Sequence, residues 1–131
     1  MKKYILLLLL PFLVYTQNID QEILLPSGWS LFSTYIIPEN NNLDSIFSNI
    51  INDVVIIKDD NGNAYWPEYD LDLIGSLTIG KSYFIKMNNP HNLVISGSQI
   101  DCDTEISLNN GWNGIGYLNP STSSIENQFE S

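Results

Sequence analysis

Short runs of alternating apolar and polar residues fill most of the chain beyond residue 16, with turn residues between the runs. A period of two is typical of β-strands, because successive side chains of a strand point to opposite faces. The pattern predicts strands within residues 23–37, 54–58, 64–67, 82–87 and 92–96. Asn61 and Gly62 lie between two of these runs. Both residues tolerate a positive φ, so we expect a β-hairpin there.

The first of these regions is broken by the turn residues 26–28. Beyond the break, apolar residues occur in both alternating sets, Trp29 and Leu31 in one and Phe32 and Ile36 in the other. A strand that is apolar on both faces is typical of a position with protein on both sides. This pattern predicts a strand that is buried on two sides.

One stretch has the spacing of a helix rather than of a strand. Its apolar residues recur at i, i+3, i+4, i+7 and i+8, namely Leu43, Ile46, Phe47, Ile50 and Ile51. This stripe predicts a short amphipathic helix over residues 43–51. Asn42 or Asn41 suits the N-cap, and Asp44 lies in the first turn, where a carboxylate is favourable.

Two copies of one motif occur in the chain, EILLPSGW from residue 22 and EISLNNGW from residue 105. They match at a spacing of 83 residues, so that Gly28 corresponds to Gly111 and Trp29 to Trp112. An internal repeat indicates repeated structural units. We therefore expect the two Gly-Trp strands to lie close together, related by an approximate two-fold axis. At both positions a tryptophan beside a glycine suits a core anchor better than a surface platform for glycans.

The order of elements predicts an α+β fold that is rich in β-structure. We expect a small, mostly antiparallel sheet or barrel-like domain with one short helix per repeat, followed by the start of a second repeat. An all-β sandwich is the alternative. Residues 17–100 form the first predicted unit, and residues 101–131 begin a second unit that packs on the first. Its helix is expected at residues 125–129, by correspondence with residues 43–47.

The first 16 residues have the pattern of a secretory signal peptide. Lys2 and Lys3 precede an apolar run over residues 5–14, which is too short for a membrane-spanning helix of about 20 residues. Small residues at 14 and 16 predict cleavage before Gln17. We therefore expect a secreted or cell-surface protein, with no membrane insertion after cleavage.

The composition is acidic, with 15 Asp and Glu against 5 Lys and Arg. Loss of the two signal lysines takes the formal net charge from −10 to −12. Nucleic-acid binders use Lys and Arg to neutralise phosphates, so nucleic acid is not an expected partner. The single cysteine, Cys102, excludes an internal disulfide, and its neighbours Asp101 and Asp103 disfavour a reactive thiolate.

Nine elements in order carry a resemblance to a known module. They are Gly28-Trp29, the predicted helix, Ile57-Lys58-Asp59, Gly62, Tyr65-Trp66-Pro67, Ile74-Gly75, residues 80–86, residues 93–97 and Gly111-Trp112-Asn113. In this order they resemble the Gly-Trp-Asn repeat module of large secreted and cell-surface mosaic proteins of marine Bacteroidota. The resemblance implies a non-catalytic building block and brings no catalytic residues. It also implies that a chain ending at Ser131, inside the second helix, is an N-terminal piece of a longer protein.

Two candidate binding sites emerge from the residues themselves. Trp66, with Tyr65 and Tyr69, follows a predicted turn and forms a candidate aromatic patch for carbohydrate. The second candidate, a calcium site, consists of Asp59, Asp60, Asn61 and Asn63, whose alternating carboxylate and amide oxygens suit calcium. The alternative for that stretch is turn chemistry. Binding of calcium would raise the melting temperature by mass action.

Nothing in the sequence has the spacing of a catalytic site. His91 is the single histidine, and no metal-ligand pattern or phosphate loop occurs. We therefore expect a secreted non-enzymatic structural or adhesive module without a cofactor, and a carbohydrate-binding module as the alternative. The expected partners are polysaccharide, other domains of a longer chain or a second copy.

Overall fold

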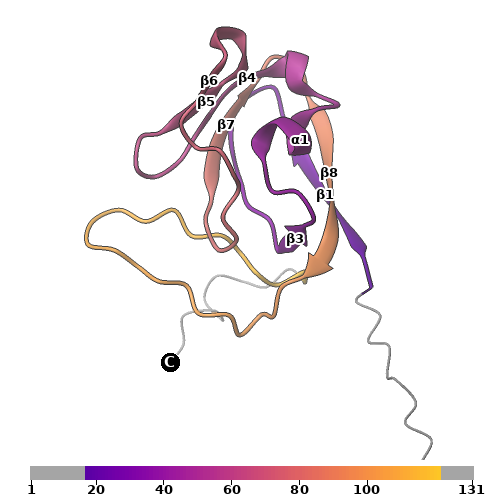
Figure 1. The fold of residues 1–131 in the computed structure, drawn as a ribbon, viewed down its shortest axis with the longest axis vertical. Helices are drawn as coiled ribbons and strands as arrows, with labels where there is room; N and C mark the ends of the chain where they lie inside the picture. The colour runs from indigo at the N-terminus through magenta and orange to yellow at the C-terminus, as the bar shows by residue number, and fades with distance from the viewer. Residues whose placement is uncertain (1–16, 122–131) are drawn as a thin grey trace, which may run out of the picture.

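Two antiparallel β-sheets form the frame of the protein in a computed structural model, which describes residues 17–121 (Figure 1). Sheet A has the order β1-β8-β3, formed by Ile19–Leu25, His91–Gln99 and Ile36–Pro38. Sheet B has the order β2-β7-β4-β5-β6, formed by Gly28–Phe32, Tyr83–Met87, Val54–Lys58, Ala64–Trp66 and Leu71–Asp72. The predicted β-rich, antiparallel character is confirmed. Both sheets are open, so the barrel-like closure that we expected is wrong.

The predicted hairpin joins β4 to β5 in sheet B. Asp59 Oδ1 accepts hydrogen bonds from the backbone N–H groups of Asn61 and Asn63, 2.9 Å and 2.8 Å away. Gly62 has a φ of +87°, a conformation that favours glycine. The predicted hairpin is therefore confirmed, with the positive φ at Gly62 but not at Asn61.

The helix is shorter than its apolar stripe predicts. Helix α1 covers Leu43–Phe47, and Asn42 caps it by accepting from the N–H of Asp44 at 2.9 Å. Beyond Phe47 the hydrogen bonds span three residues instead of four, and the chain continues through a 3₁₀ turn, η1 (Ile51–Asp53), into β4. The tighter turns end the α-helix while its later apolar residues still pack against the core.

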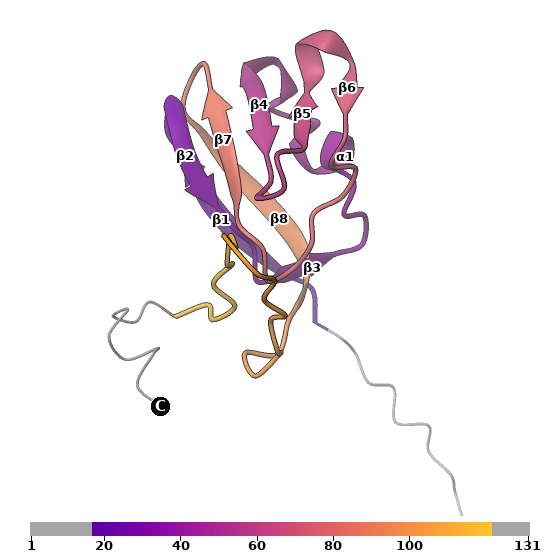
Figure 2. The ribbon, with the colours of Figure 1, turned by 90° about the vertical axis from the view of Figure 1, so that its left-hand side faces the viewer.

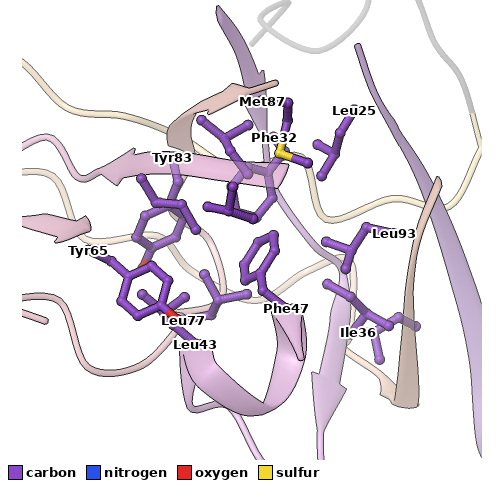
Figure 3. Close-up of a cluster of buried hydrophobic side chains, with 14 residues drawn as sticks. Leu25, Phe32, Ile36, Leu43, Phe47, Tyr65, Leu77, Tyr83, Met87 and Leu93 are labelled. Atoms are coloured by element: carbon purple, nitrogen blue, oxygen red, sulfur yellow. The ribbon is translucent and has the colours of Figure 1, made fainter. Parts of the chain in front are cut away.

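One core lies between the two sheets and α1 (Figure 3). Sheet A contributes Leu93 and Ile36, sheet B contributes Tyr65 and Tyr83, and Phe47 reaches it from the helix. The Phe47 ring is fully buried, and burial of a phenylalanine side chain stabilises a fold by about 1.5–3 kcal/mol.

Strand β2 is buried on one side only, which corrects the prediction of two-sided burial. Phe32 points into the core, whereas Trp29 and Leu31 are exposed on the opposite face. Trp29 is therefore no core anchor, and neither is Trp112, which is 98% exposed.

The segment after β8 runs beneath the sheets as a loop (Figure 2). Its second copy of the motif forms no Gly-Trp strand, so that prediction is wrong. A single antiparallel bridge joins Ile115 to Lys81, and the N–H of Gly116 donates to the carbonyl of Gly80 at 2.8 Å. The N–H of Tyr117 donates to Ser33 Oγ at 3.2 Å. The predicted signal peptide (residues 1–16) and second helix (125–129) lie outside the described residues.

Candidate functional site

Exposed aromatic and aliphatic side chains lie on the outer face of sheet B, on the paired strands β2 and β7. Trp29, Leu31 and Phe84 are 52%, 56% and 53% exposed. Leu31 lies directly opposite Phe84, and Trp29 directly opposite Lys86, across the pair β2–β7. Figure 2 shows sheet B in front of β8, so this face looks away from the core.

The register extends this surface across the sheet. Phe84 is also paired with Lys58 of β4, and Lys58 is paired with Ala64 of β5. We use the name outer face of sheet B for the side chains Trp29, Leu31, Phe84, Lys86, Lys58 and Ala64. These side chains come from the neighbouring strands β2, β7, β4 and β5. Neighbouring strands are about 4.8 Å apart, so the side chains form one continuous surface.

Two lysines converge on the indole ring of Trp29. Lys58 Nζ lies 5.7 Å and Lys86 Nζ 5.9 Å from the ring centroid. The ring face carries negative charge density and attracts cations at this distance. The cation–π contacts with Trp29 therefore place two ammonium groups beside the exposed aromatic rings of Trp29 and Phe84.

The outer face of sheet A differs in charge. Its exposed residues on β1 are Asp20, Glu22 and Leu24, and Val94 of β8 lies opposite Glu22. Glu22 accepts a hydrogen bond from the side chain of Asn92 at 2.9 Å. Sheet A thus presents carboxylates outward, whereas sheet B presents ammonium groups and aromatic rings.

The aromatic trio expected near the hairpin is divided between core and surface. Tyr65 points inward and is 3% exposed, which corrects its assignment to a surface patch. Trp66 and Tyr69 do form a pair, with ring centroids 4.7 Å apart and an edge-to-face angle of 86°. Tyr69 ends the 3₁₀ turn η2 (Pro67–Tyr69). The indole N–H of Trp66 is buried and has no hydrogen-bond partner among the described residues.

The two carboxylates among the candidate calcium ligands already accept hydrogen bonds. Besides its two backbone donors, Asp59 accepts from the amide side chain of Asn63 at 2.7 Å. Asp60 faces the other way, with Oδ2 3.1 Å from the N–H of Gly114 and Oδ1 3.4 Å from Lys81 Nζ. In residues 17–121 no three acidic, histidine or cysteine side chains are grouped as a metal site would need. Calcium binding stays a prediction of the sequence.

The carboxylate of Asp60 connects the hairpin to the second copy of the motif. The hydrogen bond from the N–H of Gly114, and to a smaller extent Lys81, holds the pKa of Asp60 below its ordinary value. Gly114 fits because it lacks a side chain, since a Cβ atom there would lie 2.8 Å from Ser82 Oγ. No local pattern of residues predicts this contact, because its partners are 54 residues apart.

His91 forms a small polar cluster at the opposite end of sheet B. Its Nε2 lies 2.6 Å from Asp53 Oδ2, and Asn89 donates to the other oxygen of Asp53 at 2.7 Å. The hydrogen bond with His91, followed by that from Asn89, lowers the pKa of Asp53. Cys102 is a free, exposed thiol 3.8 Å from the carbonyl oxygen of Leu118. Neither group has the nucleophile and base arrangement of a catalytic site.

A shallow hollow of about 350 Å³ lies beside sheet A and α1. Amide and hydroxyl groups dominate its lining, among them Asn18, Asn40, Ser45 and Asn49. It has no aromatic or basic side chain in its lining. The outer face of sheet B is therefore the better candidate for recognition.

Sequence reasoning missed Trp29 and Phe84 as exposed residues. The signal that could have found Phe84 is the alternation of β7, where Tyr83, Ile85 and Met87 are buried while Phe84 and Lys86 are exposed. A lysine two positions from Phe84 indicates that both belong to the solvent face.

Comparisons of the chain with protein-family models, with curated proteins and with solved structures find no match. Among the helices of residues 17–121, none has the length and apolar character needed to cross a membrane.

Proposed function

We propose that the chain is an exported, non-enzymatic adhesive module that binds polysaccharide through the outer face of sheet B. The observation that carries the proposal is the exposure of Trp29, Leu31 and Phe84 side by side on two paired strands. Large contiguous apolar surfaces on soluble domains mark interaction sites. A sugar ring presents a face of C–H groups with slight positive charge, which complements the negative face of an aromatic ring.

Features of the sequence support export, a place in a larger cell-surface protein and a non-enzymatic role. The signal-like N-terminus supports export, and the two Gly-Trp motifs support a chain that is built from repeated sequence units. The resemblance to Gly-Trp-Asn modules supports a place in a mosaic cell-surface protein. The sequence contains no motif with the spacing of catalytic or metal-ligand residues, which supports a non-enzymatic role.

Affinity electrophoresis tests the proposal directly. The mature chain, from Gln17, is run through gels that contain neutral or charged polysaccharides, and retardation measures binding. We expect retardation of the wild type, its loss in the double variant Trp29→Ala/Phe84→Ala, and its retention in Leu24→Ala. Leu24 is a matched control, because it is a 75% exposed apolar residue on the outer face of sheet A. Wild-type mobility that no polysaccharide changes would contradict the proposal.

The pair Trp66 and Tyr69 is a second candidate contact for the same ligand, because its rings pack edge to face beside β6. Trp66→Ala in the same gels separates the two surfaces. Loss of retardation in Trp66→Ala, with retention in Trp29→Ala/Phe84→Ala, would transfer the binding role to this pair.

A further inference from the structure

We infer that the polysaccharide bound by the outer face of sheet B is acidic, and that Lys58 and Lys86 bind its carboxylate or sulfate groups. This inference rests on the proposed function and names the chemical class of its ligand.

The lysines are distributed unevenly in the part of the chain that the structure describes. Lys81 forms an ion pair with Asp60, with Nζ 3.4 Å from Oδ1. Lys58 and Lys86 have no carboxylate within ion-pair distance among residues 17–121. The two ammonium groups that have no carboxylate partner within residues 17–121 therefore lie on the surface that also exposes the aromatic rings.

The backbone register brings these two ammonium groups together. Lys86 is directly opposite Trp29, and Lys58 reaches the same ring from the far side of β7. Each Nζ lies within 6 Å of one ring centroid. Like charges on neighbouring strands repel, and an anionic group between them would relieve this repulsion. The arrangement thus has the chemistry of an anion-binding pair next to a stacking surface.

The net negative charge of the protein does not prevent the binding of an acidic polysaccharide at physiological ionic strength. At physiological ionic strength the Debye length is about 8 Å, so charges on distant surfaces are largely screened. Strand β2 has no acidic residue, and Asp60 near Lys58 is already paired with Lys81. The local field at Trp29 is therefore set chiefly by its two lysines.

The exposed face of a sheet suits a sugar polymer better than it suits an acidic peptide or a second copy of this chain. Extended peptides gain most of their affinity by hydrogen bonding to the edge of a sheet, rather than to its face. A second copy of this chain would bring its own large negative charge, which keeps proteins apart in solution. A polysaccharide supplies both sugar rings for Trp29 and Phe84 and regularly spaced anionic groups for the lysines.

Calorimetric titration of the mature chain with three polymers tests the inference. Dextran and dextran sulfate share a backbone and differ in charge, and polygalacturonate supplies carboxylates. We expect the wild type to bind dextran sulfate, polygalacturonate or both at least about tenfold more tightly than dextran. Each of Lys58→Gln and Lys86→Gln should weaken that binding by about fivefold.

Two control variants make the result specific. Lys81→Gln removes the same charge from a lysine that is paired with Asp60 away from Trp29, and it should change the affinity by less than about twofold. Lys58→Arg/Lys86→Arg keeps both charges and should keep binding.

Several outcomes would overturn the inference. Equal affinity for dextran and the charged polymers would refute it while leaving the proposed function intact, whereas no binding to any polymer would refute both. Unchanged affinity in the glutamine variants together with new self-association would assign the lysines to the prevention of sheet-to-sheet aggregation. Tighter binding of polyglutamate than of either acidic polysaccharide would assign the surface to an acidic protein.

Discussion

The hydroxyl group of Tyr65 donates a hydrogen bond to the carboxylate of Asp44, with Oη and Oδ1 2.5 Å apart. This bond joins the middle of β5 to the first turn of α1, between residues that are 21 positions apart. The ring of Tyr65 is buried in the core, whereas Asp44 lies at the surface. A buried donor with a charged acceptor fixes the position of the helix relative to sheet B.

Removal of this hydroxyl group in Tyr65→Phe should lower the free energy of unfolding by about 1 kcal/mol, the net value of one hydrogen bond. Urea denaturation measures the change. Tyr69→Phe is the matched control, because the same atom is removed from an exposed tyrosine, and it should be neutral. Equal stability of the two variants would show that the bond to Asp44 contributes nothing.

The same tyrosine makes stability depend on alkaline pH. Burial, and then the hydrogen bond with Asp44, raises the pKa of Tyr65 well above its ordinary value of 10.0. A group whose pKa is raised on folding contributes stability below its unfolded pKa, and that contribution is lost as the pH rises further. Urea denaturation between about pH 8 and 11.5 should show a steeper loss for wild type than for Tyr65→Phe. Parallel curves would contradict this assignment.

The contact between Asp60 and Gly114 should respond to acid. The pKa of Asp60 is lowered in the folded protein, so its contribution is present above the unfolded pKa and is lost as the pH falls through the folded value. We expect Asp60→Ala to reduce the hydrogen-exchange protection of the Gly114 and Gly116 amides at neutral pH, as acidification below the ordinary value of 3.8 does in the wild type. Ile57 in β4 serves as an internal control and should stay protected. Unchanged protection at Gly114 in the variant would show that Asp60 does not hold this segment.

Gly97 is required where β3 pairs with β8. A Cβ atom at this position would lie 2.1 Å from the carbonyl oxygen of Ile37, so the two strands would have to separate. Gly97→Ala should therefore destabilise the protein by about 3 kcal/mol, at the upper end of overpacking effects. The neighbouring control Ser96→Ala, at an exposed position of the same strand, should change the melting temperature little. Similar melting temperatures for both variants would disprove the close approach.

Local patterns predicted the local structure well. The apolar run of β4, the turn chemistry at Asp59 and the cap at Asn42 each depend on residues within a few positions, and each formed as expected. These features are local, so neighbouring residues contain the information.

The sequence could not determine which face of β2 is buried. Both alternating sets of that strand include apolar residues, and only the packing of sheet B on sheet A turns Phe32 inward and Trp29 outward.

The second copy of the motif forms no strand for a different reason. In the first copy β2 pairs with β7, whose other side is occupied by β4, so no edge of β7 is left for a second Gly-Trp strand. Similar sequence motifs therefore do not form the same strand when no equivalent pairing partner is free.

The central claim is that the outer face of sheet B is the binding surface, and the three tryptophan indole N–H signals provide its most direct test. The mature chain is titrated with dextran sulfate and polygalacturonate while its ¹H–¹⁵N spectrum is recorded, with assignment by Trp29→Phe, Trp66→Phe and Trp112→Phe. We predict that the signal of Trp29 moves, together with the backbone amides of β2, β7 and β4, while the fully exposed Trp112 and the amides of β1 stay unchanged. Movement at β1 or Trp112 without movement at Trp29 would contradict the claim.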